Sequence, residues 1–465
     1  MIGRVTLLGA GPGNPELLTL LGKRRLKEAD VVLYDRLINP SLLALVPAQA
    51  ERIDVGKLPN FHKVKQSVIN QLLVDYAQNG KQVVRLKAGD PYVFGRGGEE
   101  GQFLREHGVT FDVVPGLTSA ITGLAAVGIP ITHRDYASSF HVITGHRQAD
   151  GRQLDWENIA HQEGTLVFLM GMAALTDICQ SLMSHGRQVT TPVAIVQWAT
   201  QWRQRLVTGT LKDIDARAHE QQIGSPAIIV VGEVVQLAAI LQPTLSLQGV
   251  HVLLPYTVNS QLYPALQDRG ATVDFYERST VSRIPVKLPD WTHYRELFIC
   301  DGLAYRELLK EMVNKGQDQR QLAHLHITAK NPTVAKRLQR QGILADEVSD
   351  TPMVAEGSLA IGEKGHLARS SCGGLATYEL IAKNSELPWQ LEEFQAIIFP
   401  SSASVQDFMM GVSREQWQQM AQCKLIAMGK QVEQALRQAG IEQVVIQATT
   451  IDDVLTKLER QVTHE

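Results

Sequence analysis

Short apolar runs alternate with amphipathic stretches through the first half of the chain, which is the pattern of strands followed by helices. The apolar runs at 5–10, 31–35 and 83–88 favour buried parallel strands, because a strand covered on both faces needs no polar side. Residues 66–79 place their apolar side chains on one helical face, and Gly80 is expected to end that helix. The order βαβαβ predicts a parallel sheet with helices on both faces.

From residue 115 the sequence becomes rich in small residues, which suits tight packing beside a ligand cleft. Further strands are predicted at 140–146, 165–171, 192–200 and 225–235. We therefore predict two α/β lobes, 1–114 and 115–240, with the cleft between them. Residues 241–248 are predicted to form a linker, after which the alternation of strands and helices starts again.

A glycine-rich turn follows the third predicted strand and precedes the acidic start of a helix. Gly89 lets a ligand approach the backbone closely, Asp90 can accept two hydrogen bonds, and Pro91 fixes the chain direction. Ligands of open α/β sheets bind beyond the carboxyl ends of the strands, which is where this turn lies. The turn is therefore a candidate ligand site, with an ordinary strand-to-helix turn as the alternative.

The loop after the first strand, GAGPGN at residues 9–14, is typical of dinucleotide sites because it follows a strand and opens a helix. The helix is expected within residues 16–29, with Asn14 as its cap. Asn14 also stands where the third glycine of the dinucleotide fingerprint belongs, whereas Asp35 ends the second strand as a ribose-binding acid would. An NAD-dependent dehydrogenase therefore stays an alternative.

Composition narrows the class of protein. The length of 465 residues exceeds one ordinary core and suggests about three domains. The net charge of −3 gives no general attraction to nucleic acid or membranes. The four cysteines are scattered without a CxxC pair, which indicates a reducing cytosol rather than disulfides or a zinc ribbon. No apolar run suits a signal peptide or a membrane span, and no metal site is expected at His133 or His146.

A series of sequence blocks runs in order over about residues 1–240: VTLLGAGPGNPELLTL, ADVVLYDRL, VVRLKAGDPYVFGRGGEE, VVPGLTSAITGLAAVGIPITHRDYASS, TGH, LDWENIA, TLVFLMG and SPAIIVVGEVV. In these blocks the chain strongly resembles the uroporphyrinogen-III C-methyltransferase family, of the tetrapyrrole methylase fold. The resemblance implies methyl transfer from S-adenosyl-L-methionine to two pyrrole carbons of uroporphyrinogen III, giving precorrin-2 for sirohaem or cobalamin synthesis. A methylase acting later in the cobalamin pathway is the alternative within this fold.

The same resemblance implies roles for individual residues. Asp35 and Lys57 match the family's proposed proton acceptor and donor. Ala88 stands where the family usually has glycine, a change that a negative φ would tolerate. The contacts to S-adenosyl-L-methionine would be Pro12, Ala88, Gly89, Asp90, Val93, Thr118, Ser119, Met170, Ala199 and Ala227. From residue type, the candidates to bind the carboxylates of the substrate are Arg96, Arg134, Lys63, His146 and Arg147.

Residues 247–465 resemble the uroporphyrinogen-III synthase family more weakly, in the blocks HITAKNPTVAKRLQRQGILADEV, AIIFPSSASVQDF, LIAMGKQVEQALRQAGI and ATTIDDVL. The resemblance implies a domain over 249–465 that closes hydroxymethylbilane to uroporphyrinogen III. One of its two α/β lobes would comprise residues 249–280 together with 379–465, and the other would comprise residues 281–378. The candidate residues are Tyr378, near the crossover between the lobes, and the turn residues Ser401 and Ser402.

The C-terminal half also departs from the synthase pattern. Pro255 and Pro400 replace an arginine and a threonine, and Asp301-Gly302 replaces a Thr-Ser pair. A degenerate domain that only binds tetrapyrrole therefore stays an alternative to a working synthase, as does a chain that only binds ligands. The related enzymes are dimers, so the resemblance implies a cytoplasmic homodimer acting on small molecules, without nucleic acid or membrane partners.

Overall fold

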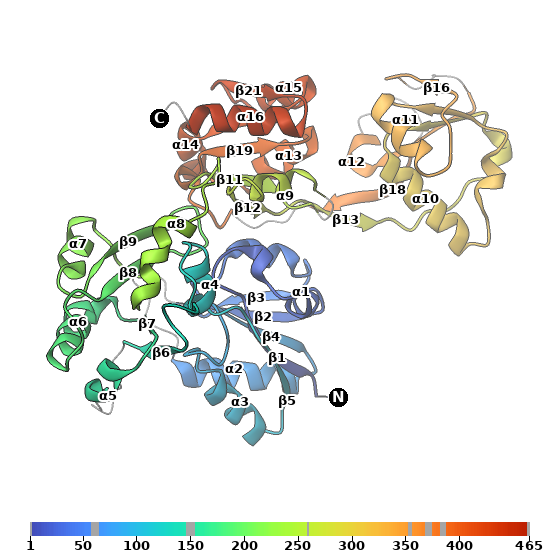
Figure 1. Ribbon diagram of the computed structural model, residues 1–465. Coiled ribbons are helices and arrows are strands. Elements are labelled where there is room, and N and C mark those ends of the chain that lie inside the picture. The colour runs from blue at the N-terminus through green and yellow to red at the C-terminus, as the bar shows by residue number, and fades with distance from the viewer. Residues whose placement is uncertain are drawn as a thin grey trace. The chain divides into compact units, whose positions relative to one another are not determined.

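The computed structural model describes residues 2–56, 65–145, 154–257, 260–351, 356–367, 374–381 and 387–462. The chain divides into two compact units, Met1–Tyr276 with Glu386–Glu465, and Glu277–Ser385. The described residues form three five-stranded sheets in the first unit and one six-stranded sheet in the second. Each sheet is covered by helices, so the fold is α/β throughout (Figure 1). Among the described residues, no helix combines the length and the apolar character that crossing a bilayer requires.

The first sheet is entirely parallel, as the βαβαβ pattern predicts, in the order β3-β2-β4-β1-β5. Its strands are β1 (Arg4–Gly9), β2 (Val31–Tyr34), β3 (Glu51–Asp54), β4 (Gln82–Lys87) and β5 (Thr110–Val114). Leucines of α1 (Leu20–Lys27) and η2 (Pro40–Leu45) pack on one face. The other face is covered by α2 (Gln66–Gln78) and α3 (Gly97–Glu106), which lie together on one side of the sheet in Figure 1.

The second sheet is mixed, with the order β6-β7-β10-β8-β9. Its strands are β6 (Phe140–Thr144), β7 (Thr165–Leu169), β8 (Pro192–Gln197), β9 (Arg205–Thr210) and β10 (Ala227–Val231). One face packs on α5 (Trp156–His161), α6 (Leu175–Ser184) and α7 (Ile214–Glu220). The other face packs on α4 (Ser119–Ala125), η4 (Glu233–Leu237) and α8 (Ala238–Leu241). Because β10 is antiparallel to β7 and β8, it begins at the edge where they end.

The third sheet is parallel, in the order β12-β11-β19-β20-β21. Its strands are β11 (His251–Pro255), β12 (Thr272–Tyr276), β19 (Ala396–Phe399), β20 (Lys424–Met428) and β21 (Val445–Ala448). Helices α13 (Ser402–Gly411) and α15 (Lys430–Gln438) cover one face, with α14 (Arg414–Gln419) beside them. The opposite face packs on α9 (Leu262–Gln267) and α16 (Ile451–Val462).

The second unit contains the fourth sheet, in the order β13-β18-β17-β14-β15-β16. Among the described residues of this unit, only the β13–β18 pair is antiparallel. The strands are β13 (Thr280–Arg283), β14 (Glu296–Ile299), β15 (His326–Ala329), β16 (Glu347–Val348), β17 (Ser358–Glu363) and β18 (Gly374–Ile381). The helices of this unit are α10 (Gly302–Asn314), α11 (Pro332–Gln339) and α12 (Lys364–Leu367).

Two predicted helix boundaries have different outcomes. The end of the second helix at Gly80 is confirmed, because α2 stops just before it and Gly80 has a φ of 79°. The helix predicted within residues 16–29 is present as α1, but the prediction that Asn14 caps it is wrong. Asn14 instead caps a short 3-10 turn, and Leu18 and Thr19 are extended, so α1 begins only at Leu20, capped by the Thr19 side chain.

Candidate active site

Three loops meet at the carboxyl edge of the first sheet. Gly89, after β4, pairs with Gly11, after β1, through two backbone hydrogen bonds of 2.8 and 3.2 Å. Gly116, after β5, lies so close that a Cβ atom on it would stand 2.1 Å from the carbonyl oxygen of Gly89. Only glycine permits this approach at Gly116. The GAGPGN loop and the Gly-Asp-Pro turn therefore form one corner.

Asp90 holds this corner together with both of its carboxylate oxygens. Oδ1 accepts a hydrogen bond from the Tyr92 backbone N–H at 2.8 Å, and Oδ2 accepts one from the Gly116 N–H at 3.0 Å. The two hydrogen bonds expected of Asp90 are therefore made to the protein backbone. They fix the turn after β4 against the loop after β5.

The corner leaves room for a ligand against the Gly89 backbone. Gly89 has a φ of 67°, and a Cβ atom there would meet only the Thr118 Cα, at 4.0 Å. Ala88 is not among the described non-glycine residues with a positive φ, so the condition for tolerating its methyl group is met. An open glycine cradle bordered by backbone N–H and C=O groups fits a polar nucleoside-type group.

The second sheet places three further predicted cofactor residues on one of its edges. Met170 follows β7, Ala199 follows β8, and Ala227 begins the antiparallel strand β10 between them. This edge reaches the first lobe, because the Asn14 backbone N–H donates to Thr200 Oγ1 at 3.3 Å. The loops from both sheets therefore face each other, with α4 and its cap Thr118 beside them.

Most of the residues with a strained backbone conformation lie in the same loops. Six described non-glycine residues have a positive φ: Phe94, Arg96, Met170, Trp198, Thr200 and Gln222. All but Gln222 lie directly after β4, β7 or β8, in loops that carry predicted cofactor residues. Such conformations cost about 1–3 kcal/mol each and concentrate at ligand-binding sites. The strain therefore marks this region independently of any resemblance.

Asp35 lies at the same edge of the first sheet, held by a buried cluster of charges. Its Oδ1 accepts from Arg85 Nη2 at 2.5 Å. The Arg85 side chain is 2% exposed, whereas the Asp35 side chain is 32% exposed. A buried arginine therefore holds a carboxylate that remains accessible to solvent. Arg85 Nε also donates to Glu100 at 3.2 Å, and Lys87 Nζ donates to the same Glu100 oxygen at 3.0 Å.

Arg85, Lys87 and Glu100 were not among the predicted site residues. Burial, and next the positive charge of Arg85, lower the pKa of Lys87, while Glu100 opposes this shift. Two cations within an otherwise apolar strand are the sequence signal that points to such a cluster. A buried strand tolerates them only where a carboxylate lies opposite.

The remaining predicted methylase residues are placed differently. Arg96, at the start of α3, is exposed and forms two hydrogen bonds with Glu99, at 2.7 and 3.0 Å. Val93 lies in the turn between Asp90 and α3, and Ser119 is the first residue of α4. Lys57, Lys63, His146 and Arg147 lie outside the described residues.

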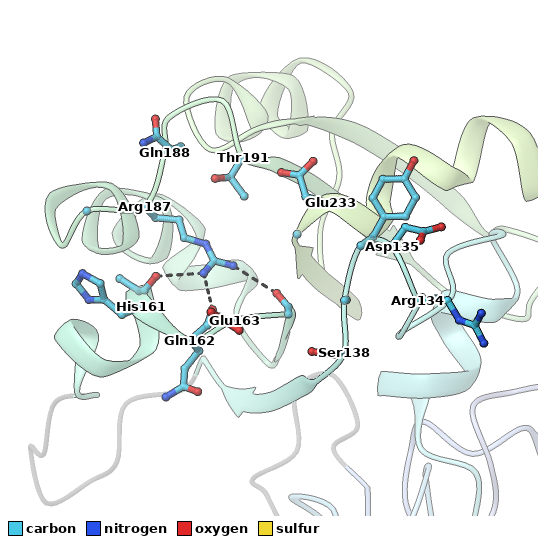
Figure 2. Close-up of a pocket in the computed structure, with 16 residues that line it drawn as sticks. Arg134, Asp135, Ser138, His161, Gln162, Glu163, Arg187, Gln188, Thr191 and Glu233 are labelled. Atoms are coloured by element: carbon cyan, nitrogen blue, oxygen red, sulfur yellow. Dashed lines mark hydrogen bonds between the residues drawn. The ribbon is translucent and has the colours of Figure 1, made fainter.

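Arg134 does not lie with the described candidates at the Gly89 corner. It borders a cavity of about 540 Å³ that reaches the starts of β7 and β8 and the end of β10, the edge opposite Met170. In Figure 2 its guanidinium lies at the rim, pointing away from the hollow. The nearby Arg187 donates to the carbonyl oxygens of Ala160 and Gln162 at 3.1 and 2.7 Å. Burial lowers the pKa of Arg187, whose guanidinium here joins protein segments.

The candidate residues of the synthase-like part have identifiable local roles. Tyr378 on β18 is buried in the second unit, and burial, then the charge of Asp301, raise the pKa of its phenol, which hydrogen-bonds to Asp301. Asp301 itself caps α10 by accepting two backbone hydrogen bonds. Ser401 caps α13 in the first unit, and Ser402 Oγ donates to the Gln431 carbonyl at 3.2 Å.

The dinucleotide alternative fails on local geometry. A dinucleotide site needs a helix that opens directly after the glycine-rich turn, so that its N-terminus faces the pyrophosphate. Here the turn leads into a single 3-10 turn, and α1 starts only at Leu20.

The chain matches the family described as Tetrapyrrole (Corrin/Porphyrin) Methylases over residues 4–215, and that described as Uroporphyrinogen-III synthase HemD over residues 375–456. The Uroporphyrinogen-III C-methyltransferase of Bacillus subtilis (strain 168) is 38% identical over 432 residues, which are 88% of this chain and 87% of that protein. The protein of the same name from Priestia megaterium is 48% identical over 238 residues, 51% of this chain and 100% of that protein.

The Siroheme synthase of Chromobacterium violaceum is 52% identical over 236 residues, and the chain spans about half the length of that protein, 50%. A crystal structure of Uroporphyrin-III C-methyl transferase from Thermus thermophilus complexed with S-adenyl homocysteine has 44% identity and a TM-score of 0.44. The aligned region covers 50% of this chain and 99% of the Thermus thermophilus chain. Because the Bacillus subtilis relative aligns over most of both proteins, this chain belongs to the uroporphyrinogen-III C-methyltransferase family, and it carries a uroporphyrinogen-III synthase (HemD) domain towards its C-terminus.

Proposed function

We propose that residues 1–240 transfer methyl groups from S-adenosyl-L-methionine to two pyrrole carbons of uroporphyrinogen III, giving precorrin-2. The observation that carries the proposal is the open corner at Gly89 beside the Arg85–Asp35 pair. A methyl-transfer site needs a pocket for the donor next to a group that removes a proton. Family membership supplies the substrate class, since the relative similar over most of its length is a methyltransferase of this substrate.

The open corner fits S-adenosyl-L-methionine, which supplies a methyl group already activated on a sulfonium sulfur. Gly89 would let the ligand lie against the backbone, with Pro12 and Thr118 beside it. Ala199, Met170 and Ala227, together with Ala88, Val93 and Ser119, are proposed to complete the pocket. The protein's main task is then to hold the reacting atoms in line.

Asp35 is proposed to accept the proton that the ring carbon loses after methylation. The Arg85 guanidinium fixes Asp35 Oδ1, and the partial exposure of the side chain leaves the carboxylate accessible from solvent. Lys57 is kept as the proposed proton donor. Arg96, Lys63, His146 and Arg147 remain proposals for binding substrate carboxylates, whereas the position of Arg134 at the opposite edge gives no support to that role.

Mass spectrometry after incubation with uroporphyrinogen III and S-adenosyl-L-methionine tests this function. We expect a product that has gained two methyl groups. A methylase that acts later in the cobalamin pathway would leave uroporphyrinogen III unchanged, so the absence of any gain in mass would overturn the proposal.

Replacing Asp90 with alanine is expected to weaken binding of S-adenosylhomocysteine about tenfold, because two backbone N–H groups lose their acceptor and the corner loosens. Isothermal titration calorimetry measures the change. Asp318→Ala is the matched control, since Asp318 accepts from the Arg320 N–H two residues on, at 2.9 Å, within the second unit. An unchanged dissociation constant for Asp90→Ala would remove Asp90 from the site.

We further propose that the C-terminal domain converts hydroxymethylbilane to uroporphyrinogen III and so produces the substrate of the N-terminal part. The HemD match supports this, as does the capped strand-to-helix turn at Ser401. A coupled assay that starts from hydroxymethylbilane with the full chain tests it. Methylated product indicates a working synthase, whereas product formed only from added uroporphyrinogen III indicates a degenerate domain.

The homodimer and the cytoplasmic location stay proposals. Family resemblance alone supports the dimer, which light scattering on the purified chain would test. The location rests on the scattered cysteines, of which Cys179 and Cys423 are buried free thiols.

A further inference from the structure

The third sheet contacts two of the loops at the proposed methyl-transfer site, the loop after β2 and the loop after β8. The contacts run through Asn39 and Ser41 after β2, Trp202 after β8, and His251 and Asp274 on β11 and β12. We call these five residues the junction cluster. All of them belong to the first compact unit.

Asp274 is the centre of the junction cluster. This carboxylate is 4% exposed. Its Oδ1 accepts from Asn39 Nδ2 and from Ser41 Oγ, each at 2.8 Å, and its Oδ2 accepts from His251 Nε2 at 2.8 Å. A buried carboxylate depends on such donors, because it has lost its contact with water. Each donor is therefore held in place by its hydrogen bond to the Asp274 carboxylate.

The Asn39 amide extends this link to the donor-binding corner. Its Nδ2 also donates to the Gly13 carbonyl oxygen at 3.0 Å, and its Oδ1 accepts from the Ser41 N–H at 2.8 Å. Ser41 Oγ accepts in turn from the Phe275 backbone N–H at 2.8 Å. The loop of Asp35 and the GAGPGN loop are thus both tied to β12.

The loop after β8 is held by a stack of rings. Trp202 stacks on His251 with 5.1 Å between ring centroids, and His251 stacks on Phe394 at 3.9 Å. Next to Trp202, the Arg203 guanidinium lies 3.6 Å from the Trp198 ring centroid and 3.6 Å from Glu393. These contacts stabilise the strained backbone at Trp198, one residue before Ala199.

We propose that Asp274 and His251 are positioning residues for methyl transfer, through which the third sheet fixes the loop after β2 and the loop after β8. This inference rests on the proposed function, since those loops carry Asp35 and Ala199. The C-terminal part would then do more than supply substrate: it would set the geometry in which the N-terminal part reacts. A misplacement of about 1 Å costs roughly 10²-fold in rate, so loosened loops should lower turnover strongly.

Asp274→Asn tests the proposal, with Glu296→Gln as the matched control. Glu296 is a carboxylate of the second unit, 2% exposed, that accepts from two hydroxyl groups at 2.6 Å. We expect Asp274→Asn to lower the kcat of methylation about 10–100-fold. We also expect faster hydrogen–deuterium exchange in residues 36–45 and 198–204. Glu296→Gln should change neither measurement.

Ser41→Ala provides a second variant in case Asp274→Asn does not fold, because it removes one link and leaves the carboxylate with two donors. Unchanged kcat and unchanged exchange in a folded variant would overturn the proposal. A loss of stability without faster exchange in the two loops would also overturn it. If the wild-type chain methylates nothing, the proposed function fails. Faster loop exchange in Asp274→Asn would still support the anchoring, and unchanged exchange would refute it.

Discussion

Replacing Asp35 with asparagine is expected to lower the turnover number of methyl transfer by about 10²–10⁴, the usual contribution of a general base. The amide oxygen can still accept the hydrogen bond from Arg85, so the local geometry should survive. The amide cannot take up a proton, so the ring carbon would lose its proton to water alone. Steady-state methylation assays measure the loss, while calorimetry with S-adenosylhomocysteine should show nearly unchanged affinity.

Asp112→Asn is the control for Asp35→Asn, because Asp112 also lies on the first sheet and pairs with arginine, at 2.7 Å to Arg4 and 3.3 Å to Arg25. Its position on β5, away from the carboxyl edge, predicts wild-type turnover. Methylation by Asp35→Asn at the wild-type rate would show that another group removes the proton.

The interior strands could be predicted because a strand that is buried on both faces is a mostly continuous run of apolar residues, which is recognisable in the sequence. Strand β2 falls within its predicted range, as do β8 and β10 of the second sheet, and β1 and β4 each begin one residue before theirs. The same reasoning located the corner at Gly89. A glycine followed by aspartate and proline at the end of such a strand has few local conformations, and the turn lies at the ligand-binding edge.

The missed strands of the first two sheets share one property: β3, β5 and β9 all lie at sheet edges. An edge strand has a partly solvated face and is often short, so its composition resembles that of a loop. β3 shows this clearly, because its sequence ERID carries three charges and none of its residues is fully buried. Only pairing with β2 makes it a strand.

The charged parts of the site could not be predicted from local sequence for a different reason. Arg85 reads as an interruption of an apolar strand until Glu100, fifteen residues later, is seen to return to it. The contact between Asn39 and Asp274 joins residues 235 positions apart. Neither residue type nor periodicity reports such partners, because they depend on how helices and sheets pack. The sequence therefore indicates a candidate ligand site, but not which residues would hold the proposed reacting groups in place.

Replacing Arg85 with leucine is expected to destabilise the first sheet by about 3–5 kcal/mol, the usual cost of removing one partner from a buried ion pair. Glu100 is fully buried and, within the part of the chain that the structure describes, would keep Lys87 as its only cationic partner. Asp35 would lose its fixed partner as well, so turnover should fall together with stability. Hydrogen exchange of the slowest amides in β1 and β4 measures the free energy of opening this sheet.

Arg96→Ala is the control for Arg85→Leu, because it removes an arginine that lies outside the buried charge cluster. Arg96 pairs with Glu99 on the surface, where both side chains are more than half exposed, and such pairs contribute about 0–1 kcal/mol. We therefore expect little change in the exchange of β1 and β4 amides for Arg96→Ala. Equal exchange in the two variants would show that Glu100 is stabilised without Arg85.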